Sequence, residues 1–120
     1  MRIGEMVRRT GVSERLLRYY EQQGLLVPRR LPSGYRVYAE ADVETVRRIR
    51  RLLAAGLNTA TIAQILPCVR GDDQHLVPVC PDLVDQLRRE RDRMTVAIDE
   101  LRASRSILDT VIAAGPSSGD

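Results

Sequence analysis

The sequence contains no tryptophan, phenylalanine or lysine, only one histidine and only two cysteines. A single histidine leaves few candidates for acid–base chemistry, and no nucleophile–base pair or phosphate-binding glycine loop accompanies it. We therefore predict no catalytic residue and no enzyme. No apolar run exceeds four residues, which excludes a transmembrane helix. The first residues lack the apolar core of a signal peptide, so we expect a cytoplasmic protein whose cysteines are reduced at rest.

Because lysine is absent, all 19 cationic side chains are arginines, set against 16 acidic residues in a chain of 120. Residues 1–60 contain 12 arginines and 6 acidic residues, whereas residues 61–120 contain 7 arginines and 10 acidic residues. This asymmetry indicates a basic head that binds a polyanion, followed by a segment with a different role.

The apolar pattern of the head predicts short helices and one hairpin. One helix covers residues 2–9, and a second runs from its N-cap Ser13 to Gln23. Thr10-Gly11-Val12 lie between them, and the two helices with this turn form a helix-turn-helix. Prolines and a Ser-Gly pair then predict a β-hairpin wing over residues 26–38. Two more helices follow, from about residue 40 to Gly56 and from Thr59 to Leu66, so that the head spans residues 1–66.

The second half is predicted as a linker over residues 67–81, a helix of ~45 Å over residues 82–113, and a flexible tail over 114–120. A lone helix of this length cannot bury an apolar stripe, so we expect a dimeric coiled coil. Arg91 and Arg105 also fall on the seam, where they either fix the register against acidic partners or extend to water. The predicted dimer interface is the heptad stripe of Val84, Leu87, Met94, Ile98, Leu101, Leu108 and Ile112.

Arginine and tyrosine concentrate in two short segments of the head, Arg15 to Leu25 and Gly34 to Tyr38. Arginine pairs with phosphate or with a guanine edge, and a tyrosine hydroxyl donates to phosphate. We therefore expect the second helix to enter the major groove of double-stranded DNA, with the wing beside it on the backbone.

Together these motifs resemble those of the MerR family of transcription regulators. The resemblance covers residues 2–66 and continues more weakly through the long helix. It rests on Ile3-Gly4-Glu5-Met6-Val7, Thr10-Gly11-Val12-Ser13, Leu17-Arg18-Tyr19-Tyr20-Glu21, Gly24-Leu25, Gly34-Tyr35-Arg36-Val37-Tyr38, and then Arg50, Ala55, Gly56-Leu57, Ile62 and Ile65.

The resemblance implies a mainly α fold with a winged helix-turn-helix head and an antiparallel coiled coil that makes a homodimer. Such a dimer would bind promoter DNA between two elements set too far apart. It would bend and untwist that spacer, in response to a signal, so that RNA polymerase engages both elements. The alternative is an architectural or excisionase-like DNA-bending protein that has no inducer.

The resemblance also implies four DNA contacts: Arg18, Tyr19, Tyr35 and Arg36. Ser13 and Arg15 are further candidates at the exposed start of the recognition helix. Tyr38 either joins this DNA-binding surface or packs under the wing, whereas Tyr20 faces the core. The basic run on the third helix either touches phosphates or is a solvated face; it consists of Arg47, Arg48, Arg50 and Arg51.

The sequence defines the signal that such a regulator would sense less clearly than it defines the DNA-binding residues. Metal-sensing relatives carry cysteines in a loop after the long helix, and residues 113–120 contain no cysteine or histidine. An iron–sulfur cluster needs four cysteines, so we predict no cofactor. We also predict no metal: Cys68 and Cys80 form a structural or redox disulfide, or stay as two inert buried thiols. The alternative to this prediction is a zinc site with His75 and a group from a partner subunit. An apolar effector pocket beside the linker is a further alternative.

Overall fold

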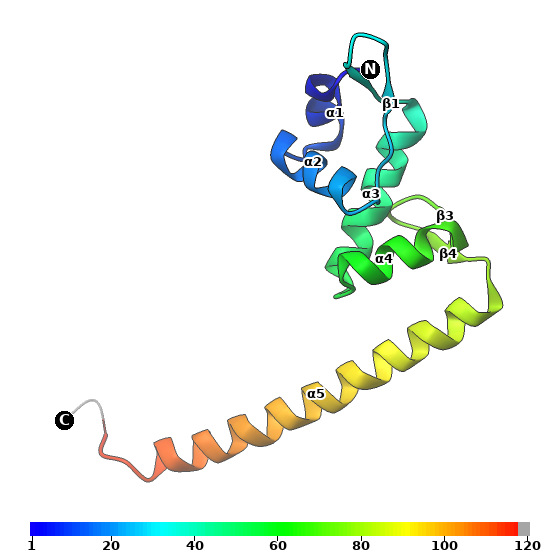
Figure 1. Ribbon diagram of the computed structural model, residues 1–120. Coiled ribbons are helices and arrows are strands. Elements are labelled where there is room, and N and C mark those ends of the chain that lie inside the picture. The colour runs from blue at the N-terminus through cyan, green and yellow to red at the C-terminus, as the bar shows by residue number, and fades with distance from the viewer. Residues whose placement is uncertain (118–120) are drawn as a thin grey trace. The chain divides into compact units, whose positions relative to one another are not determined.

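The computed structural model describes residues 1–117 and has the predicted order of helices, with a small wing (Figure 1). The fold is mainly α with a winged helix-turn-helix head, as predicted. The chain divides into two compact units, residues 1–80 and the segment from Pro81 onward. The first unit contains α1 (Ile3–Thr10), α2 (Glu14–Gln22), β1 (Arg29–Arg30), β2 (Arg36–Val37), α3 (Glu40–Ala54), α4 (Thr59–Ile65), a 3₁₀ turn (Leu66–Cys68), β3 (Val69–Gly71) and β4 (Leu76–Pro78).

Local capping explains where the helices of the head begin and end. The N–H of Gly11, whose φ of 72° is left-handed, closes α1 on the carbonyl of Val7. The Ser13 hydroxyl then accepts the N–H of Leu16 at 3.2 Å and starts α2. Asn58 caps α4 in the same way, accepting the N–H of Thr61 at 2.8 Å. The tight turn between α1 and α2 follows from these local interactions.

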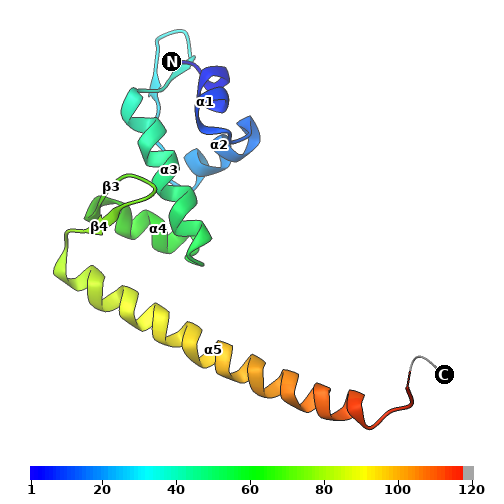
Figure 2. The same ribbon diagram turned by 180° about the vertical axis from the view of Figure 1, so that it is seen from behind.

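The core of the head forms where α3 contacts α1 and α4, an arrangement that Figure 2 shows from behind. α2 packs on α1 and directs Leu17 and Tyr20 inward, both almost fully buried. The prediction that Tyr20 is a core residue is confirmed. Burial of this kind stabilises a side chain by about 1.5–3 kcal/mol. The most deeply buried residues are Met6, Leu17, Tyr20, Leu26, Tyr38, Val43, Val46, Ile49 and Ile62.

The wing is a two-stranded antiparallel hairpin that an acidic residue ties to α2. Its register pairs Arg30 with Arg36. The Glu21 side chain of α2 is only 18% exposed, and its Oε2 lies 2.8 Å from Nε of Arg36. The same carboxylate lies 3.4 Å from Nη2 of Arg30. One carboxylate therefore links the second helix to both strands of the wing.

The segment that we predicted as a linker contains a second antiparallel hairpin, β3–β4, with Arg70 opposite Val77. Its turn is held by Asp72, whose carboxylate accepts the N–H groups of His75 and Gln74. These hydrogen bonds, with that from His75 as the larger cause, lower the pKa of Asp72. Arg48 of α3 donates from Nε to the carbonyl of Gly71 at 2.7 Å and fixes the hairpin to the head.

The second unit is dominated by α5 (Pro81–Ala113), which matches the predicted long helix. Residues 118–120 of the predicted tail lie outside the described residues. Within residues 1–117, no helix combines the length and apolar character that crossing a membrane requires.

We expect Glu21→Gln to lower the free energy of unfolding by about 1 kcal/mol, because a partly buried carboxylate loses two charged partners. Glu14→Gln is the matched control, since Glu14 pairs with Arg18 on the open surface of α2, where such a pair contributes roughly 0.3–0.5 kcal/mol. Urea denaturation at low ionic strength measures both. Equal losses in the two variants would contradict the structural role of Glu21.

Candidate nucleic-acid interface

The outer face of α2 carries the residues predicted to read DNA. Arg15 is exposed, and the side chains of Arg18 and Tyr19 are about half exposed. Arg18 donates from Nη2 to Glu14 at 2.6 Å, one turn earlier on the same face. These residues surround a shallow hollow of about 580 Å³ that Gln22 also lines. Ser13 lies at the start of this face, where its hydroxyl oxygen already serves as the cap of α2.

The wing adds a tyrosine and an arginine next to Arg18. Tyr35 at its tip is 56% exposed, and the guanidinium carbon of Arg2 lies 4.3 Å from its ring centroid. Arg36 is half-buried, with its Nε turned to Glu21. A cavity of about 400 Å³ is lined by Arg2, Arg18, Tyr35 and Arg36 together. Three of the four DNA contacts implied by the resemblance therefore meet at one place, and Tyr19 lies one residue further along α2.

Tyr38 differs from this group because it lies in the core. It is only 1% exposed, and its hydroxyl makes no hydrogen bond with any described residue. Burial, and secondarily the charge of Glu21, raises its pKa, so the hydroxyl stays neutral. The structure therefore agrees with the prediction that the Tyr38 ring packs under the wing and not with the prediction that Tyr38 contacts DNA. We leave Tyr38 out of the interface.

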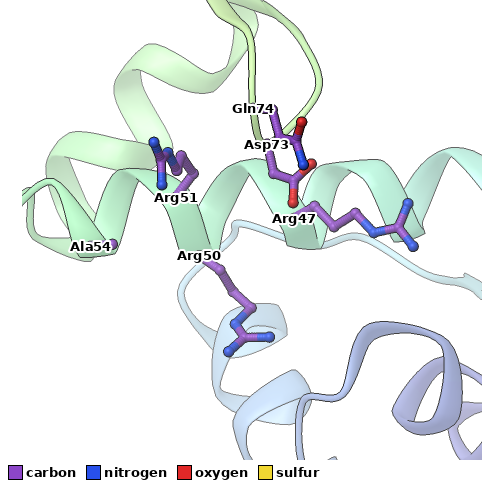
Figure 3. A pocket seen from close by; sticks show the side chains of 6 residues that line it. All are labelled: Arg47, Arg50, Arg51, Ala54, Asp73 and Gln74. Atoms are coloured by element: carbon purple, nitrogen blue, oxygen red, sulfur yellow. The ribbon is translucent and has the colours of Figure 1, made fainter.

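The arginines of α3 do not form one converging cluster. Figure 3 shows Arg47, Arg50 and Arg51 leaving the helix in different directions around a cavity of about 430 Å³ that Asp73 and Gln74 also line. Arg50 donates to the carbonyl of Thr10 at 3.3 Å and Arg47 to Glu44 at 2.7 Å. Arg48 donates to the carbonyl of Gly71 in the second hairpin. Most of this basic run therefore makes contacts inside the head.

Cys68 and Cys80 are joined in a disulfide, with Cα atoms 5.3 Å apart. The N–H of Val79 also donates to the carbonyl of Cys68 at 2.8 Å, so the backbone closes at the same point as the side chains. The bond encloses the β3–β4 hairpin and ends one residue before α5. The alternative of two inert free thiols is therefore wrong, because both cysteines are in the disulfide.

The heptad stripe of α5 is largely uncovered by its own chain. Ile98 is 48% exposed, Leu101 70% and Ile112 72%. Ile107 and Val111 are also exposed, although the heptad pattern did not include them. This helix therefore presents more apolar surface than a/d spacing alone indicates.

Sequence reasoning gave no role to Arg2 or Glu21, and it placed Arg48 only in the basic run of the third helix. Their roles depend on neighbours far along the chain, since Arg2 stacks on Tyr35, Glu21 binds Arg36, and Arg48 binds Gly71. Glu21 did carry a signal, because it stands within the Arg-Tyr-Tyr-Glu run of the recognition helix, whereas Arg2 carried none.

Comparisons with known proteins agree with this architecture. The family model described as MerR HTH family regulatory protein matches residues 1–67. "Heavy metal-dependent transcription regulator 2" of Rhizobium meliloti (strain 1021) is 35% identical over 102 residues, which cover 84% of this chain and 69% of that protein.

Two solved structures have the same fold. The transcription regulator PbrR691 of Ralstonia metallidurans CH34, in complex with lead(II), superposes with a TM-score of 0.81 at 25% identity, covering 98% of this chain and 89% of that one. HiNmlR, a MerR family regulator lacking the sensor domain and bound to promoter DNA, gives a TM-score of 0.57 at 21% identity, covering 93% of this chain and 86% of that one.

The family match covers more than half of the chain and coincides with the winged head. The alignment with the first-named relative covers more than two thirds of that protein's length. These relatives are transcription regulators and not enzymes. The chain therefore belongs to the MerR family of helix-turn-helix transcriptional regulators.

Proposed function

We propose that the protein acts as a homodimer that binds promoter DNA in a sequence-specific manner, with α2 in the major groove and the wing on the adjacent backbone. The observation that carries this proposal is the meeting of Arg18, Tyr35 and Arg36 around one cavity, next to Arg15 and Tyr19 on the outer face of α2. Four of these five side chains are exposed and lie outside the core, whereas Arg36 is half-buried, with its Nε at Glu21 and its two Nη groups without a partner among residues 1–117. Arginine and tyrosine are suited to phosphates and base edges.

The dimer is proposed from the apolar stripe of α5. An exposed stripe along a helix of 33 residues is not stable in water unless another surface covers it. A second copy of the same helix offers a complementary stripe, and the antiparallel arrangement follows from the family resemblance. Two heads joined in this way would contact an inverted repeat, because the symmetry of the protein dictates the symmetry of its site.

In the proposed mechanism, the dimer bends and untwists the DNA between two promoter elements so that RNA polymerase engages both. Deforming a duplex of this length costs several kcal/mol, which contacts at both heads must offset. HiNmlR, whose fold is similar, was solved on promoter DNA. The alternative, an architectural DNA-bending protein without an inducer, would bind the same DNA and leave transcription unchanged.

The proposed signal is oxidation and reduction of Cys68 and Cys80. Reduction would take two electrons and two protons from a cellular dithiol, which itself becomes a disulfide, and would free both thiols. The closed loop stabilises the folded hairpin by about 3 kcal/mol, and it adjoins the first residue of α5. Opening it would loosen the joint through which the spacing of the two heads is set.

Some relatives are named as heavy-metal regulators, which raises ion sensing by the same two thiolates as an alternative. Tetrahedral metal sites need more ligands than two thiolates. Within residues 1–117, no group of three or more histidine, cysteine, aspartate or glutamate side chains is arranged to hold a metal ion. We therefore favour thiol oxidation as the signal.

Arg18→Ala is expected to weaken binding to an inverted-repeat duplex, selected from a random pool by the protein itself, by about 1–3 kcal/mol. Arg89→Ala is the matched control, because it removes the same charge from an exposed position outside the heptad seam. Fluorescence anisotropy measures both affinities. Undiminished binding by Arg18→Ala would count decisively against the interface.

Oxidised and reduced protein are expected to differ in transcription from a promoter carrying that repeat, by roughly 5- to 150-fold. Cys68→Ser and Cys80→Ser should each match the reduced protein and ignore added oxidant, because neither can form the bond. Run-off transcription measures all four samples, and DNA binding by each sample checks that the heads are folded. Equal transcription from all four would remove the thiol signal, and the architectural alternative would be favoured only if that level also equals transcription without the protein.

A further inference from the structure

The cavity of about 400 Å³ between the start of α1 and the wing is lined by three arginines and no acidic residue. Arg2 comes from the residue before α1, Arg18 from α2 and Arg36 from β2. Three arginine side chains from three separate segments therefore line one space. Such an arrangement repels cations and favours an anion with several acceptor oxygens.

The guanidinium groups retain donors for a ligand. Nε of Arg36 is directed to Glu21, while its two Nη groups make no hydrogen bond with any of residues 1–117. Arg18 commits one Nη2 bond to Glu14. Arg2 makes no ion pair in the described part of the chain, and its guanidinium carbon lies 4.3 Å from the centroid of the Tyr35 ring.

Arg2 is also held in place by the backbone. The N–H of Tyr38 donates to the carbonyl of Met1 at 2.6 Å, and the amino group of Met1 donates to the carbonyl of Tyr38 at 2.6 Å. These reciprocal bonds fix the residue before Arg2 against the end of the wing. The carbonyl of Arg2 in turn accepts the N–H groups of Glu5 and Met6, so Arg2 is held both by the residue after β2 and by the first turn of α1.

Two glycines also line the cavity, Gly4 in the first turn of α1 and Gly34 at the tip of the wing. Packing does not require glycine at position 4, because an added Cβ would meet only Nη1 of Arg8 at an ordinary 3.8 Å. A longer side chain at position 4 would therefore stand at the edge of the cavity, one turn before Arg8. The partial positive charge of the first turn of α1 adds to the field of the guanidinium groups.

We propose that this cavity binds one phosphate of the DNA backbone, with Arg2 as a contact and Tyr35 as the residue that positions it. The site rests on the proposed DNA-binding function and extends it to the start of α1, which lies outside the recognition helix and the wing. Its contribution is independent of base sequence, because phosphates carry no sequence information. It anchors each head and leaves Arg15 and Tyr19 to read the groove.

The test uses the full chain, a labelled duplex of random sequence, and anisotropy titrations over a range of salt concentrations. Gly4→Glu places a carboxylate at the edge of the cavity, and Gly4→Gln adds the same bulk without the charge. An acidic residue in the first turn of a helix is favourable, so Gly4→Glu should melt at the same temperature as the unsubstituted protein or higher. Arg2→Ala is compared with Arg89→Ala, which removes an equal charge from α5.

We expect Gly4→Glu to weaken DNA binding roughly tenfold or more, and Gly4→Gln clearly less. Arg2→Ala should lower the slope of affinity against salt by about 1 for each head, while Arg89→Ala leaves it unchanged. If the unsubstituted protein binds and Arg2→Ala binds equally well with the same salt slope, the phosphate site is wrong and the DNA-binding function stands. If the unsubstituted protein does not bind duplex at low salt, the proposed function itself fails and the site falls with it.

A separate measurement distinguishes a DNA phosphate from a free anion. Inorganic phosphate is added to the unsubstituted protein without DNA, at constant ionic strength. A raised melting temperature that Arg2→Ala abolishes, together with unchanged DNA binding by Arg2→Ala, would assign the cavity to a free anion and overturn the proposal.

Discussion

The burial of Leu17 and Tyr20 on the inner face of α2 is the constraint on which the rest of the head depends. Once these two side chains pack against α1 and the core, helical geometry leaves Arg15, Arg18 and Tyr19 no direction but outward. Glu21 then carries the orientation of α2 to the wing through Arg36. The proposed interface is therefore a consequence of packing on the opposite side of one short helix.

The second hairpin is likewise held by specific contacts, and it leads directly into the long helix. Arg48 holds the β3–β4 turn on α3, and the disulfide closes the ends of the hairpin. The residue after Cys80 is the first of α5. Any event that opens the disulfide acts at the covalent joint between the DNA-binding head and the helix proposed to pair the two subunits. In the proposed dimer, small changes at this joint would alter how the two heads are spaced, which is why we place the proposed signal there.

Much of this architecture could be predicted from sequence because it is local. The Ser13 cap, the Gly11 turn and the apolar faces of the helices each depend on residues within one or two turns. The second hairpin was missed because strands of three residues are too short to show alternation, and their turn residues are also typical of a linker. Tyr38 was ambiguous for a related reason, since a two-residue strand does not define which neighbour faces inward.

The parts of the site that sequence could not predict are contacts between distant segments. Nothing in the first residues indicates that Arg2 stacks on Tyr35, and spacing alone does not decide whether Cys68 and Cys80 meet. The exposure of the stripe on α5 was expected from its heptads, and the dimer that it implies is the central claim. Light scattering on the protein with excess inverted-repeat duplex tests this claim most directly. The account predicts two chains for each duplex, and one chain for each duplex would contradict it.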